Sequence, residues 1–188
     1  MALILASASP RRKELLLNLK LCFSIEVADI DETILKGLLP QETVMRLARE
    51  KAEWVQKNHP KDIIIGADTI VVLDGKILGK PEGTEQAKEM LRQLSGRKHE
   101  VYSGVAVLSL ERSEMFFEKS TVTFYNLKET LIARYVATGE PLDKAGAYGI
   151  QQYGALLVKS IEGDYFNIVG LPISRLCQCL EGFGVSVL

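Results

Sequence analysis

The sequence predicts an α/β protein built on a mixed sheet, because two kinds of hydrophobic pattern alternate along its 188 residues. Apolar runs rich in β-branched residues predict strands, and segments with apolar residues at helical spacing lie between them. Asp74-Gly75 follows one apolar run and is typical of a hairpin turn, so some neighbouring strands should be antiparallel. With 47% hydrophobic and 25% charged residues, we expect one domain spanning residues 1–188.

The first half of the chain is predicted to hold strands separated by two helices. Residues 3–6 form a short apolar run, after which Ser9 is a natural N-cap and Pro10 a natural first residue of a helix. Pro40 begins a second, amphipathic helix that should end near Gln56. The other elements expected here are a strand at 23–28, an irregular acidic loop at 29–33, and a strand at 63–73 that returns at 76–78.

The second half is predicted to contain further strands and three helices. Thr84 should cap a helix that stops at Ser95-Gly96, and Pro172 should begin a closing helix that ends near Glu181. Between these helices we expect strands at 100–110 and 115–125, a helix at 128–139, a glycine-punctuated segment at 145–154, a strand at 155–161, a turn at 162–164 and another short strand.

Composition excludes several classes of protein. The 23 basic and 24 acidic residues leave a formal charge of −1, so no overall field attracts nucleic-acid polymers or a membrane surface, and any anion site must be local. The chain has no run of about 18 to 20 apolar residues and no basic leader before its first apolar stretch, so we expect neither a membrane span nor a signal peptide. The spacing of the three cysteines matches neither a CxxC redox motif nor a usual zinc site. We therefore expect reduced thiols and a cytoplasmic protein.

A basic segment, Ser7 to Lys13, occupies the start of the first predicted helix. A helix N-terminus already carries partial positive charge, so each cation there costs about 0.3 to 1 kcal/mol unless an anion compensates. Backbone N–H groups, the hydroxyls of Ser7 and Ser9, and the guanidinium groups of Arg11 and Arg12 all suit phosphate oxygens. The segment therefore predicts a phosphate-binding turn; the alternative is a solvated basic turn with an ordinary serine cap.

Two charged residues break apolar patterns. Lys51 falls inside the apolar stripe of the helix at 40–56, so it should be paired or line a cleft, unless it extends to solvent at the helix edge. Asp68 interrupts the apolar strand at 63–73, where a carboxylate needs cations, hydrogen bonds or a metal. Gly66 and Ala67 beside Asp68 should leave room for a close approach, which favours a functional site over a structural aspartate.

Weaker signals come from two turns and one loop. Lys80 lies in a stiff Gly-Lys-Pro turn that could add a further cation, although exposed lysines beside turns are common. Asp31-Glu32 is either a solvated loop or a source of oxygen ligands for Mg²⁺ or Mn²⁺. The segment 143–151 is a glycine-rich bend or a binding loop in which Gln151 offers a donor and an acceptor to a base edge.

Taken in order, these motifs resemble the Maf family of septum-formation-inhibitor-like nucleoside triphosphate pyrophosphatases. The resemblance covers nearly the whole chain through its segments at 5–12, 31–32, 47–52, 66–69, 79–81, 143–151, 162–165 and 169–172. It implies an elongated, inosine-triphosphatase-like α/β fold in which a central mixed sheet has flanking helices and a cleft lies between two lobes. It also implies that a divalent metal cation assists hydrolysis of a nucleoside triphosphate to the monophosphate and pyrophosphate.

The resemblance also implies roles for individual residues. The functional positions of the family fall on Ser9, Arg11, Arg12, Glu32, Lys51, Asp68 and Lys80. Arg11, Thr69 and Gln151 are similar to the set in the branch that prefers dTTP and UTP. Gln152 departs from the pattern, because many relatives have glycine there. The family also suggests a homodimer.

The expected chemistry is attack of water on the α-phosphorus, which requires neutralised phosphates and an oriented water. Asp68 is either the general base or a metal ligand, and Glu32 a second metal ligand. Two other functions stay open: a nucleotide-binding regulatory module acting on cell division, and a pyrophosphatase of the inosine-triphosphate type. Whether the substrate is an ordinary or a modified pyrimidine nucleotide is also open.

Overall fold

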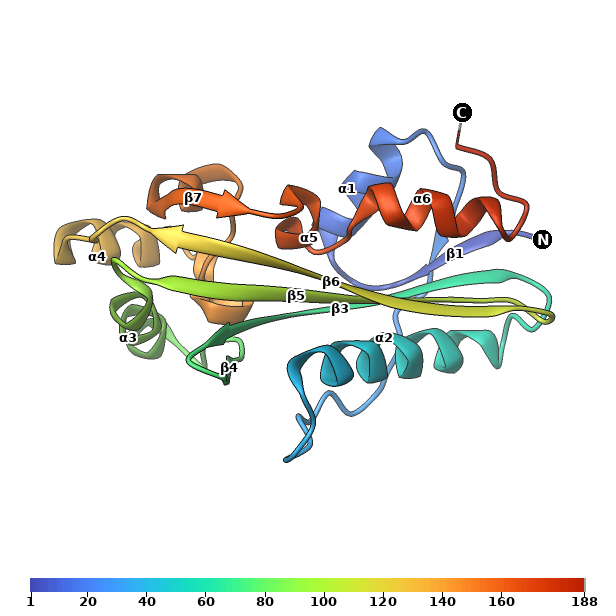
Figure 1. The fold of residues 1–188 in the computed structure, drawn as a ribbon, viewed down its shortest axis with the longest axis horizontal. Coiled ribbons are helices and arrows are strands. Elements are labelled where there is room, and N and C mark those ends of the chain that lie inside the picture. The colour runs from blue at the N-terminus through green and yellow to red at the C-terminus, as the bar shows by residue number, and fades with distance from the viewer. Residues whose placement is uncertain (188) are drawn as a thin grey trace. The chain divides into compact units, whose positions relative to one another are not determined.

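The computed structural model describes residues 1–187, and its centre is a mixed seven-stranded sheet (Figure 1). The strands follow the order β2-β1-β3-β5-β6-β7, with β4 paired to β3. β1 is parallel to β2 and β3, whereas β4 is antiparallel to β3 and β7 to β6. The strands are β1 Leu3–Ala6, β2 Ser24–Ile25, β3 Ile63–Leu73, β4 Lys76–Leu78, β5 Lys98–Leu108, β6 Ser113–Phe124 and β7 Val158–Glu162.

The chain forms two compact units. The first consists of Met1–Asp68, Ser103–Glu118 and the C-terminal segment from Gly170, and the second of Thr69–Tyr102 and Lys119–Val169. β3, β5 and β6 each contribute residues to both units, so the division falls within strands. The expectation of one domain over residues 1–188 stays a prediction.

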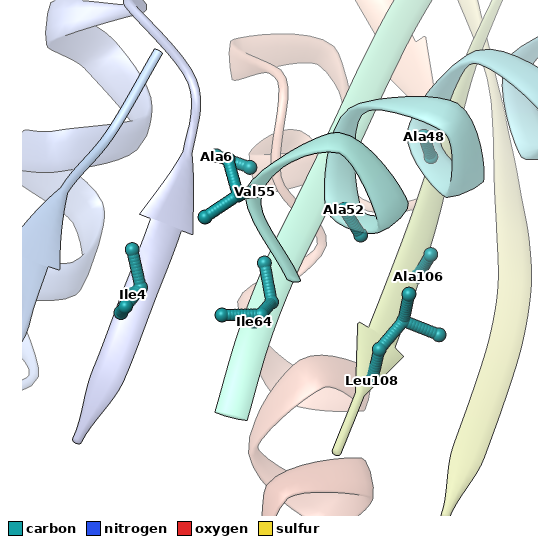
Figure 2. Packing of buried hydrophobic residues seen from close by; sticks show 8 residues of the cluster. All are labelled: Ile4, Ala6, Ala48, Ala52, Val55, Ile64, Ala106 and Leu108. Carbon is teal, nitrogen blue, oxygen red and sulfur yellow. The ribbon is translucent and has the colours of Figure 1, made fainter. Parts of the chain in front are cut away.

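In the first unit, helices cover both faces of the strands. α2 (Pro40–Gln56) lies against one face, and α1 (Pro10–Asn18) and α6 (Ile173–Glu181) lie on the other (Figure 1). Figure 2 shows the core beneath α2, where small and branched apolar side chains of the helix and of β1, β3 and β5 meet. They are Ile4, Ala6, Ala48, Ala52, Val55, Ile64, Ala106 and Leu108.

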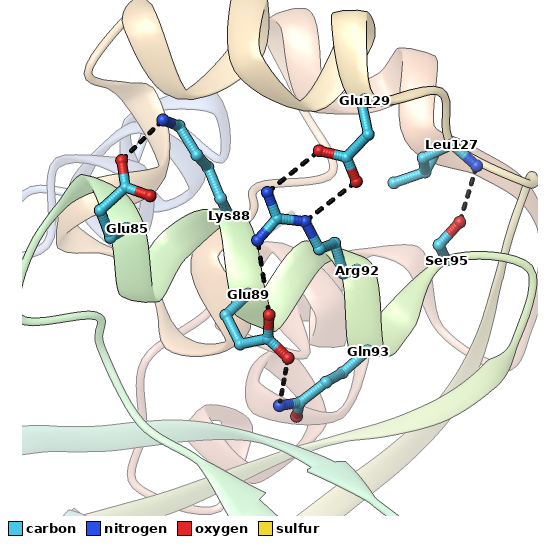
Figure 3. A network of polar contacts seen from close by, with 8 residues as sticks. All are labelled: Glu85, Lys88, Glu89, Arg92, Gln93, Ser95, Leu127 and Glu129. Atoms are coloured by element: carbon cyan, nitrogen blue, oxygen red, sulfur yellow. Dashed lines mark hydrogen bonds and ion pairs between the residues drawn. The ribbon is translucent and has the colours of Figure 1, made fainter.

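In the second unit, α3 (Thr84–Leu94) packs against α4 (Glu129–Ala137). Arg92 bridges the two helices with two hydrogen bonds to Glu129, from Nε at 2.9 Å and from Nη2 at 3.0 Å (Figure 3). The pair is exposed, and exposed ion pairs contribute little to stability. The remaining elements are three 3-10 helices, at Glu140–Asp143, Ala145–Ala147 and Gln152–Leu157, and α5, Tyr165–Val169.

Most predicted elements are present, and the bounds of β1, α2, β3 and β4 are those expected. Pro10 begins α1, with Ser9 as its N-cap. Asp74 and Gly75 both have positive φ, of 50° and 75°, as the hairpin turn between β3 and β4 requires. No helix within residues 1–187 is long and apolar enough to cross a membrane. The three cysteines are unpaired, and burial raises the pKa of Cys179 to about 12.

Four predicted details are wrong. The strand expected at 23–28 is only Ser24–Ile25, because this exposed edge pairs with β1 at two residues. Thr84 is the first residue of α3, and the N-cap is Gly83, whose carbonyl accepts a hydrogen bond from the Ala87 amide. The strand expected at 155–161 begins at Val158 because a 3-10 helix occupies the residues before it.

The fourth error is the short strand expected after residue 164, which is the helix α5. Asp164 Oδ1 accepts a hydrogen bond from the Phe166 amide at 2.8 Å, which starts the helix in the manner of an N-cap. Asn167 then fixes the helix, because its Nδ2 donates to the Val101 carbonyl and to Ser120 Oγ. These partners are distant in the chain, so the local pattern did not show them.

Candidate active site

The turn between β1 and α1 is held by its own serines and by one buried arginine. Ser9 Oγ accepts from the Arg12 amide at 3.5 Å, and the Ser9 amide donates to Ser7 Oγ at 3.2 Å. Arg12 folds back, so that Nη1 donates to Ser7 Oγ at 3.0 Å and Nε to the Gly170 carbonyl at 2.8 Å. Arg12 thereby fixes the turn, while Arg11 is partly exposed beside it.

Electrostatics link Arg12 to the acidic residues of the first unit. Arg12 is only 8% exposed, and burial lowers the pKa of its guanidinium. The charges of Asp68 and Glu32 oppose this shift, and the charge of Arg11 adds to it. Arginine side chains remain charged in proteins, so Arg12 keeps a positive charge beside the turn. The basic turn and the two carboxylates therefore lie close enough to act on one another.

Lys51 joins the two predicted metal ligands. Its Nζ lies 2.7 Å from Asp68 Oδ1 and 2.7 Å from Glu32 Oε1. Lys51 and Asp68 are each 8% exposed, whereas the Glu32 side chain is 51% exposed. The lysine is thus paired inside the fold and does not extend to solvent. The ion pair satisfies both buried charges, as a buried lysine and a buried carboxylate require.

Two glycines allow α2 to bring Lys51 to Asp68. A Cβ on Gly66 of β3 would lie 2.1 Å from the Ala48 carbonyl oxygen, and one on Gly104 of β5 would lie 2.4 Å from the Val44 carbonyl. The helix backbone therefore rests directly on both strands. The close approach expected beside Gly66 is therefore made by α2, which fills that space.

Glu32 lies in a loop that is tied to α2. Asp31 Oδ1 accepts hydrogen bonds from the Thr33 amide at 2.9 Å and from Thr33 Oγ1 at 2.6 Å, and these bonds lower the pKa of Asp31. Arg46 Nη2 donates to the Thr33 carbonyl at 2.7 Å. Of the acidic pair, Asp31 shapes the loop and Glu32 contacts Lys51.

Arg46 is a residue that the sequence reasoning missed, because it falls on the polar face of the helix pattern. Its Nη1 bonds both carboxylate oxygens of Glu50, at 2.9 and 3.0 Å, which leaves Nη2 directed to the loop. The signal in the sequence was an Arg-Glu pair at i,i+4. That signal is ordinary on helix surfaces and says nothing of a third partner.

Lys80, Thr69 and Gln151 belong to the second unit. The Gly79 carbonyl accepts from the Gly146 amide at 3.0 Å, so the turn that carries the exposed Lys80 adjoins the glycine-rich segment. Thr69 follows Asp68 in β3, and Gln151 immediately precedes the 3-10 helix at 152–157. Their place in a common site stays a prediction.

The glycines of the segment 143–151 are explained by packing within the chain. A Cβ on Gly146 would lie 2.9 Å from Val71 Cγ1, and one on Gly149 would lie 3.0 Å from Lys144 Cε. At both positions a neighbouring part of the protein, not a ligand, takes the space. Gln152 has a φ of 52°, which glycine adopts without strain and glutamine does not.

The donors available to a divalent metal are few. Across the described residues, no three His, Cys, Asp or Glu side chains are grouped so that they could hold a metal ion. Glu32 and Asp68 share one ammonium, which marks a position where a cation is stabilised. Two carboxylates suit a hard ion such as Mg²⁺, which takes its other ligands from water and phosphate. The carboxylates of Glu32 and Asp68 therefore fit a divalent metal cation.

Comparison with known proteins places the chain in a class and then in a family. The solved structure of the Staphylococcus aureus Ham1 protein has the same fold, with a TM-score of 0.56 over 97% of this chain and 99% of that one, at 16% identity. This match and the sheet described above confirm the predicted α/β class with a central mixed sheet. The family model described as Maf-like protein matches residues 2–183, so the chain belongs to the Maf family, as its motifs suggested.

Curated relatives support the same placement. Proteins named dTTP/UTP pyrophosphatase from Bacillus pumilus (strain SAFR-032) and Bacillus mycoides (strain KBAB4) are each 52% identical to this chain. Both matches cover 98% of this chain and 97% of the relative. The protein of that name from Bacillus cytotoxicus is also 52% identical, over 96% of this chain and 94% of its own length.

Proposed function

We propose that the protein hydrolyses nucleoside triphosphates, above all dTTP and UTP, to nucleoside monophosphate and pyrophosphate. The observation that carries this proposal is the group in which Lys51 Nζ lies 2.7 Å from both Asp68 and Glu32, with Arg12 electrostatically coupled to both acids. A site that only binds a polyanion gains nothing from carboxylates near phosphate unless a metal intervenes. The names of the relatives point to the same reaction.

Positive charge for the triphosphate comes from the N-terminal turn and from lysines. The start of α1 offers backbone N–H groups with Ser7 and Ser9, as helix N-termini do for phosphates. Arg11 is proposed to contact phosphate oxygens, and Arg12 holds the turn through its bonds to Ser7 and Gly170. Lys51 and Lys80 supply the remaining cations of the proposed site.

Glu32 and Asp68 are the residues that would hold a divalent cation, Mg²⁺ or Mn²⁺. When bound, such a metal neutralises phosphate charge and polarises the phosphoryl oxygens. Asp68 is assigned to the reacting water: one carboxylate oxygen either takes the proton of the attacking water or ligates the metal. Lys51 holds Asp68 in place for either role, because its Nζ donates a hydrogen bond to Asp68 Oδ1 at 2.7 Å. Thr69 and Gln151 are proposed to recognise the pyrimidine base.

A nucleotide panel tests the reaction and the substrate. Purified protein is mixed with dTTP, UTP, dCTP, GTP or ITP, with MgCl₂ or with EDTA, and the products are separated by ion-exchange chromatography. We expect monophosphate and pyrophosphate from dTTP and UTP in preference to the others, and no turnover in EDTA. Diphosphate nucleotide with inorganic phosphate would contradict the reaction, and preference for ITP would contradict the substrate. Tight binding without turnover would favour the regulatory alternative.

The cellular setting proposed here follows from the substrate. Nucleoside triphosphates are small cytoplasmic molecules, and the cysteines of this chain are unpaired, so we place the protein in the cytoplasm. Its partner is then the nucleotide itself, with neither a nucleic-acid polymer nor a membrane required. A homodimer is the expectation from the family, and size-exclusion chromatography with light scattering would measure it.

A further inference from the structure

The loop that carries Glu32 lacks regular structure. Residues 26–39 contain neither helix nor strand, and Glu32 is exposed. Burial therefore does not fix the carboxylate, and contacts of the Glu32 side chain such as its ion pair with Lys51 do not by themselves order the backbone of the loop. A ligand held on such a segment needs support from outside it, because small displacements of a catalytic group reduce its effect.

Arg46 gives that support through the loop backbone. Its Nη2 donates to the Thr33 carbonyl at 2.7 Å, and Glu50 holds the other side of the guanidinium with two bonds. The Arg46 side chain is 22% exposed, and its Nε is buried without a hydrogen-bond partner. An unsatisfied buried donor is unfavourable, so the other contacts of the guanidinium must hold it in this position.

Thr33 is fixed from both sides. Its amide and hydroxyl donate to Asp31, and its carbonyl accepts from Arg46. Glu32 lies between Asp31 and Thr33, so its backbone is held by this arrangement. Lys51 follows Arg46 by five residues on the same helix, and α2 therefore contacts both the backbone of the loop and the Glu32 carboxylate.

We propose that Arg46 is a positioning residue, which holds the Thr33 carbonyl so that Glu32 faces Asp68 and the metal position. This inference rests on the proposed function for its catalytic consequence. It assigns to Arg46 a role in metal affinity, with no contact to the substrate. Since supporting residues around metal ligands typically change affinity by 10- to 100-fold, the effect should be measurable.

The chain contains a matched control for the experiment. Arg49 and Glu53 form the same i,i+4 pair on the same helix, with Nε 2.6 Å from Oε1. Within residues 1–187, Glu53 is the only hydrogen-bond partner of the Arg49 side chain. Arg46→Gln and Arg49→Gln therefore each remove an i,i+4 ion pair from α2, and only the first also releases the loop.

Three measurements compare wild type, Arg46→Gln, Arg46→Lys and Arg49→Gln. The affinity for Mn²⁺ alone is measured by electron paramagnetic resonance. The Mg²⁺ concentration for half-maximal dTTP hydrolysis is measured separately from kcat, and the rate of trypsin cleavage after Lys36 reports the order of the loop. We expect Arg46→Gln to weaken Mn²⁺ binding about 10-fold, raise the Mg²⁺ requirement similarly and speed cleavage. Arg46→Lys should recover part of each effect, and Arg49→Gln should match wild type.

The outcomes separate this inference from the proposed function. Equal Mn²⁺ affinity and equal cleavage rates in Arg46→Gln and Arg49→Gln would overturn the role of Arg46. Equal loss of melting temperature in the two variants together with a changed Mn²⁺ affinity only in Arg46→Gln would support it. Wild-type protein that binds Mn²⁺ but hydrolyses no nucleotide would refute the proposed function and leave the cleavage and Mn²⁺ comparisons as a test of Arg46.

Discussion

Lys51 pairs with both carboxylates of the candidate site through a single ammonium. It contacts Asp68 inside the fold and Glu32 at the surface, at equal distances of 2.7 Å. Removing either partner of a buried pair leaves a charge uncompensated, which is the usual source of large losses of stability. Because Lys51 would still pair with Glu32, substitution of Asp68 should affect catalysis more than folding.

Asp68→Asn tests the role of the carboxylate directly. Asparagine keeps the shape of the side chain, but it can neither accept a proton from water nor ligate a metal strongly. We expect kcat for dTTP to fall by about 10² to 10⁴, the range for loss of general acid-base catalysis, with the protein still folded. Steady-state kinetics measure kcat, and circular dichroism shows whether the variant is folded.

Asp74→Asn is the matched control, because Asp74 is an exposed turn residue that pairs with Arg97. Asparagine tolerates its positive φ of 50°, so this variant should keep wild-type activity. Hydrolysis by Asp68→Asn near the wild-type rate, with nucleotide binding unchanged, would eliminate both roles assigned to Asp68.

At the scale of elements, the packing of α2 on the sheet sets the distance between Lys51 and Asp68. Gly66 and Gly104 let the backbone of the helix rest on β3 and β5, and alanines at 48 and 52 continue the close contact. Small residues on both surfaces leave little freedom to adjust, since protein interiors are close-packed. The position of the Lys51 ammonium thus depends on Gly66 and Gly104, which carry no functional group themselves.

Gly66→Ala should therefore destabilise the protein and displace α2. The added Cβ would meet the Ala48 carbonyl oxygen at 2.1 Å and Ala52 Cβ at 2.9 Å, distances that require the backbone to shift. Overpacking of this kind typically costs about 1 to 3 kcal/mol in the free energy of unfolding. Urea denaturation followed by circular dichroism gives the value.

Gly79→Ala provides the comparison, because a Cβ there meets nothing within 4 Å. Its free energy of unfolding should stay within about 0.5 kcal/mol of wild type. Equal stability of the two variants would show that α2 does not rest on Gly66 as described.

The success of prediction differed between elements for physical reasons. α2 and β3 have the expected bounds because a helix-starting proline and a long β-branched run are local signals. Lys51 and Asp68 stood out because each places a charge in an apolar pattern. Arg46 fits its own helix pattern, and its partner Thr33 is 13 residues away in the chain, so only the folded chain shows its contact with the loop.

On the scale of the whole molecule, the two units divide inside the strands β3, β5 and β6. The boundary after Asp68 falls in the middle of β3, between two residues that the sequence reasoning had already marked. A single apolar run therefore contributes residues to both units. This is why the sequence predicted one domain, an interpretation that no observation on the described residues overturns.

The pH dependence of stability should come in large part from one buried histidine. His99 is 2% exposed, and its ring packs edge-on against Phe124 and Tyr148. Its Nε2 lies 2.7 Å from the Tyr148 hydroxyl, and its Nδ1 has no hydrogen-bond partner among the described residues. Burial lowers the pKa of His99 to about 4, so the folded protein holds it neutral where an unfolded chain would not.

The sign of the effect follows from proton binding. The histidine of an unfolded chain has a pKa of about 6.5, so between that value and pH 4 the unfolded state binds a proton that the folded state excludes. The free energy of unfolding is therefore highest above pH 6.5 and falls as the pH decreases. From pH 7 to pH 5 the contribution of His99 should be a loss of about 2 kcal/mol.

His99→Gln isolates this contribution, because glutamine can still hydrogen-bond the Tyr148 hydroxyl and does not titrate. Urea denaturation at pH 7, 6 and 5 gives the free energy of unfolding of both proteins. Wild type should lose about 2 kcal/mol more than the variant across this range, whatever their difference at pH 7. Hydrogen-bonded carboxylates such as Glu26 and Glu129 have lowered pKa values and so keep their contribution until the pH falls below their usual range. Parallel pH dependences in the two proteins would mean that His99 is protonated, or solvated, in the folded state.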